Sequence, residues 1–165
     1  MQKLTMCLPE IKLAGIKVRT SHQNELDWAN GKIFPCVKKY FQESLVEKIT
    51  NRQKPGVTFC VYTEYTSGFT GEYTYFIGEE VIDHNVPNGI DTLTILPQTY
   101  TKFTTKPGTM PDVVKGAWQK IWGMSDADLG GKRNFHADFE IYDDRASDPN
   151  HHNIVLDIYV GIEKL

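Results

Sequence analysis

The chain has 165 residues, of which 40% are hydrophobic, 12% aromatic and 24% charged, and its formal net charge is −3. Such a chain is long enough to bury a hydrophobic core without disulfides or metal ions. Beyond Lys38–Lys39 no run of basic residues stands out, which argues against a nucleic-acid-binding surface, and no apolar run approaches the roughly 20 residues of a membrane helix. Three widely spaced cysteines predict free thiols in a cytoplasmic protein.

The first half of the chain predicts the order strand, helix, strand, strand. Apolar and charged residues alternate from Gly15 to Thr20, as in a strand. Residues 33–49 place apolar side chains on one helical stripe, with Pro35 in the first turn. Residues 57–66 and 72–82 are rich in β-branched and aromatic residues and flank a glycine-containing turn, which predicts a hairpin.

The second half repeats this order with little sequence identity. An opening strand is predicted at residues 93–97 and 100–105, a helix at 113–122, and two strands at 137–142 and 153–162. We therefore expect an α+β fold of one domain, residues 1–165, built from two pseudo-symmetric repeats at about 4–86 and 92–164. The natural assembly is one curved antiparallel sheet with two main helices on one face, and the seam between the repeats is a common place for a ligand.

An acid in the middle of a predicted strand is the most informative single residue. Alternation along the strand places Asp138, Glu140 and Tyr142 on one face of the sheet. If Glu140 is buried, its charge needs a partner, and a bound cation surrounded by aromatic rings would supply one. The alternative from alternation alone is a solvent-facing Glu140 on an open sheet surface. The acidic set of Asp138, Glu140, Asp143 and Asp144 is interpreted as solvated rather than as a catalytic pair or a calcium site.

Several aromatic residues are candidates for the wall of such a site. Trp118 and Trp122 lie one helical turn apart and share a face. Tyr62 and Tyr75 belong to the predicted hairpin, and Tyr159 to the last strand. Each ring can instead belong to the hydrophobic core, and sequence alone leaves this open.

Other kinds of chemistry leave no pattern in the sequence. The five histidines lack zinc-site spacing, and no nucleophile elbow, phosphate loop or dinucleotide fingerprint is present. Cys60 lies within an apolar strand, which predicts an inert buried thiol. We therefore expect neither a metal nor a cofactor.

Five short stretches, taken in order, resemble the gyrase-inhibitor-like superfamily of effector-binding domains. They are residues 13–21, 73–81, 96–103, 117–122 and 138–143, the last being similar to the Phe-Glu-x-Tyr-Asp strand of that superfamily. The superfamily includes the effector domains of AraC-type and MerR-type regulators. The nearest resemblance is to stand-alone effector-binding proteins of integron cassettes.

The resemblance implies a non-enzymatic module that binds a small, lipophilic, cationic molecule. Glu140 would lie at the centre of an aromatic-lined cleft, with Trp118, Trp122, Tyr62, Tyr75 and Tyr159 as wall candidates. It also suggests a regulator or another protein as a partner. Direct DNA binding is not expected, because the two repeats occupy the chain and such regulators use a separate helix-turn-helix segment.

Two alternatives remain open. In the first, a buried Glu140 with a raised pKa acts as the general base of a small-molecule hydrolase. In the second, the chain inhibits a topoisomerase by binding it as a protein, an idea that depends on family analogy alone.

Overall fold

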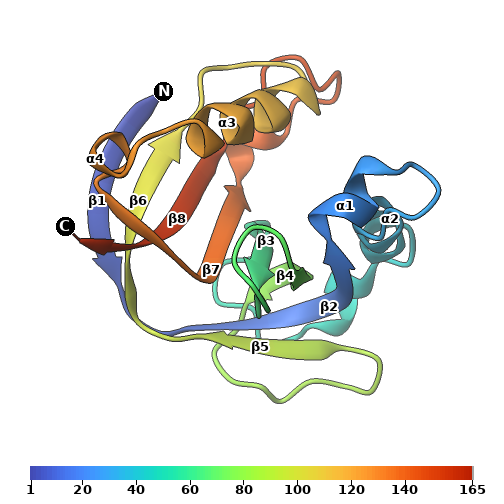
Figure 1. Cartoon of the computed structure of the whole chain (residues 1–165). Helices are drawn as coiled ribbons and strands as arrows, with labels where there is room; N and C mark the ends of the chain where they lie inside the picture. Colours follow the sequence, from blue (N-terminus) through green and yellow to red (C-terminus); the bar gives the residue numbers. More distant parts are fainter. Residues whose placement is uncertain (165) are drawn as a thin grey trace.

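In the computed structural model, which describes residues 1–164, eight antiparallel strands form one open, curved sheet with helices on one face (Figure 1). In chain order the elements are β1 (Gln2–Leu8), β2 (Ile11–Ser21), α1 (His22–Leu26), α2 (Ile33–Gln42), η1 (Leu45–Lys48), β3 (Thr58–Thr63), β4 (Glu72–Glu80), β5 (Asp91–Ile95), β6 (Gln98–Thr104), α3 (Asp112–Trp122), α4 (Asp126–Leu129), β7 (Gly131–Tyr142), η2 (Asp144–Ala146) and β8 (Asp157–Lys164). The α+β class predicted from the sequence is confirmed.

The strand order is symmetric about the centre of the sheet. It runs β1-β6-β8-β7-β3-β4-β2-β5, so exchanging each of β1–β4 with the corresponding strand of β5–β8 reproduces the same order in reverse. The central pair is β3 and β7, in which Cys60 lies opposite Glu140. The outermost strands cross between the halves, because β1 pairs with β6 and β5 pairs with β2. The repeat was visible in the sequence, whereas β1 was not predicted.

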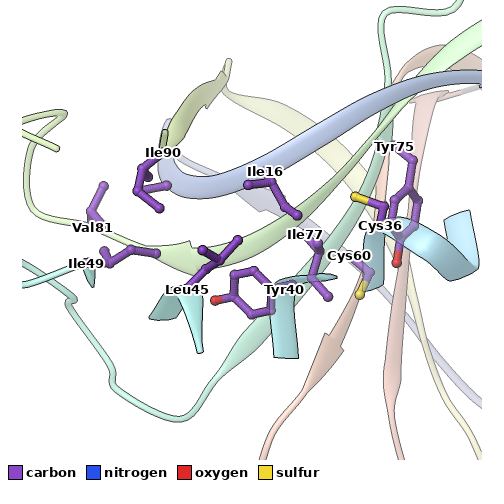
Figure 2. Packing of buried hydrophobic residues seen from close by; sticks show 11 residues of the cluster. Ile16, Cys36, Tyr40, Leu45, Ile49, Cys60, Tyr75, Ile77, Val81 and Ile90 are labelled. Carbon is purple, nitrogen blue, oxygen red and sulfur yellow. The ribbon is translucent and has the colours of Figure 1, made fainter. Parts of the chain in front are cut away.

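Both main helices cover the same face of the sheet. Cys60, Glu140 and Ile158 lie directly opposite one another across β3, β7 and β8, so their side chains share this face. Helix α2 covers the first half; Figure 2 shows its buried residues Cys36 and Tyr40 packed against strand residues Ile16, Cys60 and Ile77.

Helix α3 covers the second half of that face. Its buried residues Ala117, Trp118 and Ile121 pack in one cluster with Ile158 and neighbouring strand residues. Tyr62 and Tyr142 pack against both this cluster and the one under α2. The two tyrosines therefore mark the junction between the helix-covered halves.

The opposite face of the sheet is buried without helices. Leu13, Val61, Phe76 and Phe139 on this face are fully buried. Figure 1 shows why: the long β1–β2 and β5–β6 segments bend around this side of the molecule. The sheet thus supplies both walls of this second core.

Some element boundaries differ from the prediction. The expected helical stripe 33–49 is broken at Ser44, which has a φ of 49° in the left-handed region, and only the 3₁₀ helix η1 follows it. Strand β8 begins at Asp157 rather than near residue 153, because the carboxylate of Asp148 accepts hydrogen bonds from the backbone N–H groups of Asn150, His152 and Asn153 and holds that segment in a loop.

The longest helices, α2 and α3, have 10 and 11 residues. Within residues 1–164 none of the helices combines the length and the apolar character that crossing a membrane requires.

Strands β2 and β4 approach each other closely where Gly15 pairs with Gly78. A Cβ added at Gly15 would lie 1.9 Å from the carbonyl oxygen of Ile77 and 2.6 Å from the Cα of Gly78. We expect Gly15→Ala to lower the free energy of unfolding by about 1–3 kcal/mol, because backbone must move to admit the methyl group. Urea denaturation will measure this change.

Gly116 in α3 is the matched control, because a Cβ added there would meet no atom within 4 Å. Gly116→Ala should raise the free energy of unfolding by up to about 1 kcal/mol, as expected for a helix interior. Equal effects of the two substitutions would show that the close approach at Gly15 is unimportant.

Candidate functional site

In the part of the chain that the structure describes, one buried acid has no basic partner. Within residues 1–164 the buried acidic side chains are Glu79, Asp138, Glu140 and Asp157. Three of them form ion pairs: Glu79 with Arg52 at 3.7 Å, Asp138 with Arg133 at 2.7 Å, and Asp157 with Arg145 at 2.7 Å. In the same part of the chain, no lysine or arginine lies within ion-pair distance of Glu140, although its exposed fraction is only 3%.

Three hydrogen bonds hold the carboxylate of Glu140 in place. The Tyr142 hydroxyl donates to Oε1 at 2.7 Å. The Trp118 Nε1–H and the Tyr62 hydroxyl donate to Oε2 at 2.7 and 2.9 Å. The donors come from β7, α3 and β3, so the fold brings both halves of the chain to this one group. Because a carboxylate has about four acceptor positions, it keeps capacity for a ligand.

Burial and hydrogen bonding act in opposite directions on Glu140. Desolvation raises the pKa of its carboxyl above the ordinary value, and the hydrogen bonds from Tyr142, Trp118 and Tyr62 act to lower it. Desolvation, reinforced by the charge of Glu140, holds the pKa values of Tyr62 and Tyr142 well above that of a free phenol. Both hydroxyls therefore remain protonated and able to donate.

Aromatic rings continue outward from this carboxylate. The Tyr62 ring lies 5.4 Å from the ring of Tyr75 and 5.6 Å from that of Trp118, in edge-to-face geometry. The Trp118 ring stacks on Trp122 at 6.2 Å. The structure thus brings together Glu140 and four of the five aromatic residues singled out from the sequence.

Two neighbouring tyrosines were missed as site residues. The Tyr142 hydroxyl donates a hydrogen bond to Glu140. The sequence feature that could have identified Tyr142 is its position two residues after Glu140, on the same face of the strand. The ring of Tyr73 lies 5.9 Å from that of Tyr62, and Tyr73 similarly stands two residues from Tyr75 on β4. Strand alternation was therefore sufficient to find both.

Tyr159 is not beside Glu140, contrary to the grouping made from the sequence. Its cross-strand partner is Phe139, so it lies on the opposite face of the sheet, stacked on the Phe139 ring at 4.7 Å. There it lines a hollow of about 230 Å³ together with residues that include Lys54 and Asp143. Alternation within β8 could not show how that strand is aligned with β7.

Asp138 is also placed differently from the prediction, which treated the acidic set as solvated. Its side chain is fully buried and accepts hydrogen bonds from Arg133 at 2.7 Å, the Tyr65 hydroxyl at 2.7 Å and the Gly161 N–H at 2.8 Å. A break in the β7–β8 register between Arg133 and Asp138 lets the arginine turn back to the carboxylate. Asp144, by contrast, is exposed, as predicted.

The sequence of residues 6–162 matches the family of integron-associated effector-binding proteins. The chain belongs to this family. The resemblance drawn from its motifs is therefore confirmed, and membership of an effector-binding family is consistent with the binding of a small molecule.

Relatives of this effector-binding protein include YobU of Bacillus subtilis strain 168, named provisionally as a transcriptional regulator, which is 26% identical over 155 residues, 93% of this chain and 92% of YobU. An integron cassette protein of Vibrio cholerae has a similar structure, with a TM-score of 0.75, 19% identity, and coverage of 98% of this chain and 95% of that one. The structure of SAV2435 bound to tetraphenylphosphonium has a TM-score of 0.77 and 15% identity, and covers 99% of this chain and 94% of the other. At these identities the two structures establish a shared fold.

Proposed function

We propose that this protein binds a lipophilic organic cation at Glu140. The observation that supports this is the contrast among the four buried acids of residues 1–164, three of which have a basic partner in that range while Glu140 has none there. A buried carboxylate without a counter-charge costs several kcal/mol, and a bound cation removes that cost. Part of the binding free energy of the cation would therefore come from removing the cost of a carboxylate that the fold already keeps buried.

The surroundings of Glu140 favour a bulky cation over a compact one. Aromatic faces attract a desolvated cation by roughly 0.5–2 kcal/mol each, and Tyr62, Trp118 and Trp122 supply such faces. The cost of removing an ion from water falls as its radius grows, so a cation whose charge is spread over several rings enters more readily than an ammonium or metal ion. A cation without N–H groups also leaves the three donors on Glu140 undisturbed.

The comparisons support a lipophilic cation as the ligand and a regulatory role for the protein. SAV2435, which shares the fold, is bound to tetraphenylphosphonium in its structure, a cation of the kind described above. The name of YobU places a relative of nearly the same length among regulators. We infer that this protein reports the cation to a regulatory partner in the cytoplasm or sequesters it there.

The test is a titration of the protein with tetraphenylphosphonium at several pH values, followed by tryptophan fluorescence. The phosphonium does not titrate, so Glu140 is the group whose ionisation should govern its affinity. Because the pKa of Glu140 is raised, the carboxyl stays neutral above pH 4.5, its ordinary value, until the pH approaches the raised pKa. We expect the affinity to increase with pH through this window, up to tenfold per pH unit, and to level off above it.

Neutral triphenylphosphine oxide is the control ligand, since it keeps three of the four phenyl rings and lacks the positive charge. Its affinity should be weaker and nearly constant with pH. Equal affinity for the two compounds, or phosphonium binding that does not strengthen as the pH rises above 4.5, would contradict a site organised around an ionised Glu140.

A further inference from the structure

Three aromatic rings from separate segments meet beside the Glu140 site. They are His22 of α1, Phe69 of the loop between β3 and β4, and Trp122 of α3. The ring centroids of His22 and Phe69 are 4.9 Å apart, those of His22 and Trp122 are 5.5 Å apart, and those of Phe69 and Trp122 are 5.7 Å apart. Each ring therefore contacts the other two.

These contacts join the two halves of the chain on the helix-covered side. His22 and Phe69 belong to the first half and Trp122 to the second. Trp122 in turn stacks on Trp118, whose Nε1–H donates to Glu140. The aromatic contacts that begin at the Glu140 carboxylate therefore run through Trp118 and Trp122 of the second half to His22 and Phe69 of the first half.

Glu140 is too enclosed for a multi-ring ligand to reach it in this conformation. Its exposed fraction is 3%, and Cys60 and Ile158, its cross-strand neighbours, are themselves buried. The sheet beneath is continuous through β3, β7 and β8, so access requires movement of segments on the helix side.

The segments that carry His22 and Phe69 have no buried side chains. Helix α1 has five residues and none of them is buried. Phe69 is 45% exposed and Trp122 is 46% exposed. Segments with few buried contacts open at low cost. Besides the ring contacts, α1 is held by hydrogen bonds that the Thr20 hydroxyl and the Lys32 and Ile33 N–H groups donate to the Glu25 carboxylate.

We propose that His22, Phe69 and Trp122 form a gate that must part before a cation can reach Glu140. This inference rests on the proposed function and adds to it the step that controls entry. The three rings are in contact in this structure, so only the fraction of molecules with parted rings accepts ligand. The observed association rate constant is then scaled down by that fraction.

The test compares the association of tetraphenylphosphonium with wild-type protein and with Phe69→Ala by stopped-flow tryptophan fluorescence at pH 8. Removing the Phe69 ring eliminates two of the three contacts, and we expect the association rate constant to rise by about fivefold or more. Phe41→Ala is the matched control, because Phe41 is an exposed phenylalanine of α2 that contacts Tyr40 and none of the three rings. It should leave the rate constant unchanged.

A second variant, His22→Ala, removes the other ring of the first half. It should also accelerate association, and the double variant should gain much less than the product of the two single effects, because each single change already opens the gate. Association of Phe69→Ala and His22→Ala at the wild-type rate would overturn the proposal.

A measurement made without ligand tests the gate independently of the proposed cation binding. Amide hydrogen exchange of residues 22–26 should be faster in Phe69→Ala than in the wild type or Phe41→Ala. Unchanged exchange would count against the gate whatever the protein binds. Faster exchange, in a protein whose wild type binds no cation at all, would support the gate and contradict the proposed function.

Discussion

Replacing Glu140 with glutamine is expected to weaken the binding of tetraphenylphosphonium by at least about 30-fold. Removing one member of a buried charge pair costs roughly 2–5 kcal/mol of binding free energy, and glutamine removes the charge while keeping the shape of the side chain. Its amide oxygen can still accept from the Trp118 N–H, and a tyrosine hydroxyl can rotate to accept from the amide nitrogen. Equilibrium fluorescence titration of both proteins will measure the change.

The same substitution should leave the stability unchanged or raise it. Because the folded-state pKa of Glu140 is raised, the native protein binds its proton more tightly than the unfolded chain does. Stability attributable to this group is therefore lost as pH rises from 4.5 through the raised pKa. Glu140→Gln carries no ionisable group and should lack this loss, so its free energy of unfolding should match or exceed that of the wild type above the window.

Glu163→Gln is the control, because it makes the same chemical change at an exposed position of β8. It should bind phosphonium as the wild type does. If Glu140→Gln and Glu163→Gln retain equal affinity, the charge of Glu140 plays no part in recognition.

A second large effect is expected at Asp138, on stability rather than on binding. Asp138→Ala should lower the free energy of unfolding by about 3–5 kcal/mol, because it leaves the largely buried Arg133 without its counter-charge. The Gly161 N–H and the Tyr65 hydroxyl lose their acceptor as well. The Nε of Arg133 has no hydrogen-bond partner within residues 1–164, and without Asp138 the guanidinium would keep its contact with the Phe135 ring, whose centroid lies 4.3 Å away. Urea denaturation will measure the loss.

Asp144→Ala provides the matched control at an exposed aspartate a few residues further along the chain, where a change within about 0.5 kcal/mol is expected. In addition, combining Asp138→Ala with Arg133→Met should recover part of the stability, since the stranded charge is then removed. A loss of less than about 1 kcal/mol in Asp138→Ala would show that the buried pair is not important for the fold.

The features that could be predicted from the sequence are those with a local pattern. Period-two alternation revealed that Glu140 shares a face with Tyr142, and helical spacing put Trp118 and Trp122 on one stripe. The repeated order of elements placed Glu140 on a strand at the seam, and β7 does lie beside β3 at the centre of the sheet.

The features that could not be predicted depend on pairing between distant strands. Alternation shows that Tyr159 faces one side of β8, but only the register with Phe139 shows which side of the sheet that is. Asp138 looked solvated because its partner Arg133 reaches it through an irregularity that no propensity describes. Strand β1 was not predicted, because it is held by pairing with β6, about a hundred residues away.

The exchange of outer strands has a mechanical consequence. Neither half of the chain forms its side of the sheet alone. The outermost strand beside the first half is β5, which comes from the second half, and the outermost strand beside the second half is β1, which comes from the first. Pulling the halves apart would require breaking three separate ladders, β1–β6, β3–β7 and β2–β5. Because these three pairings connect the two halves, the sheet should resist bending between them. A shape change produced by an effector would then be transmitted through the helical layer rather than by hinging of the two halves.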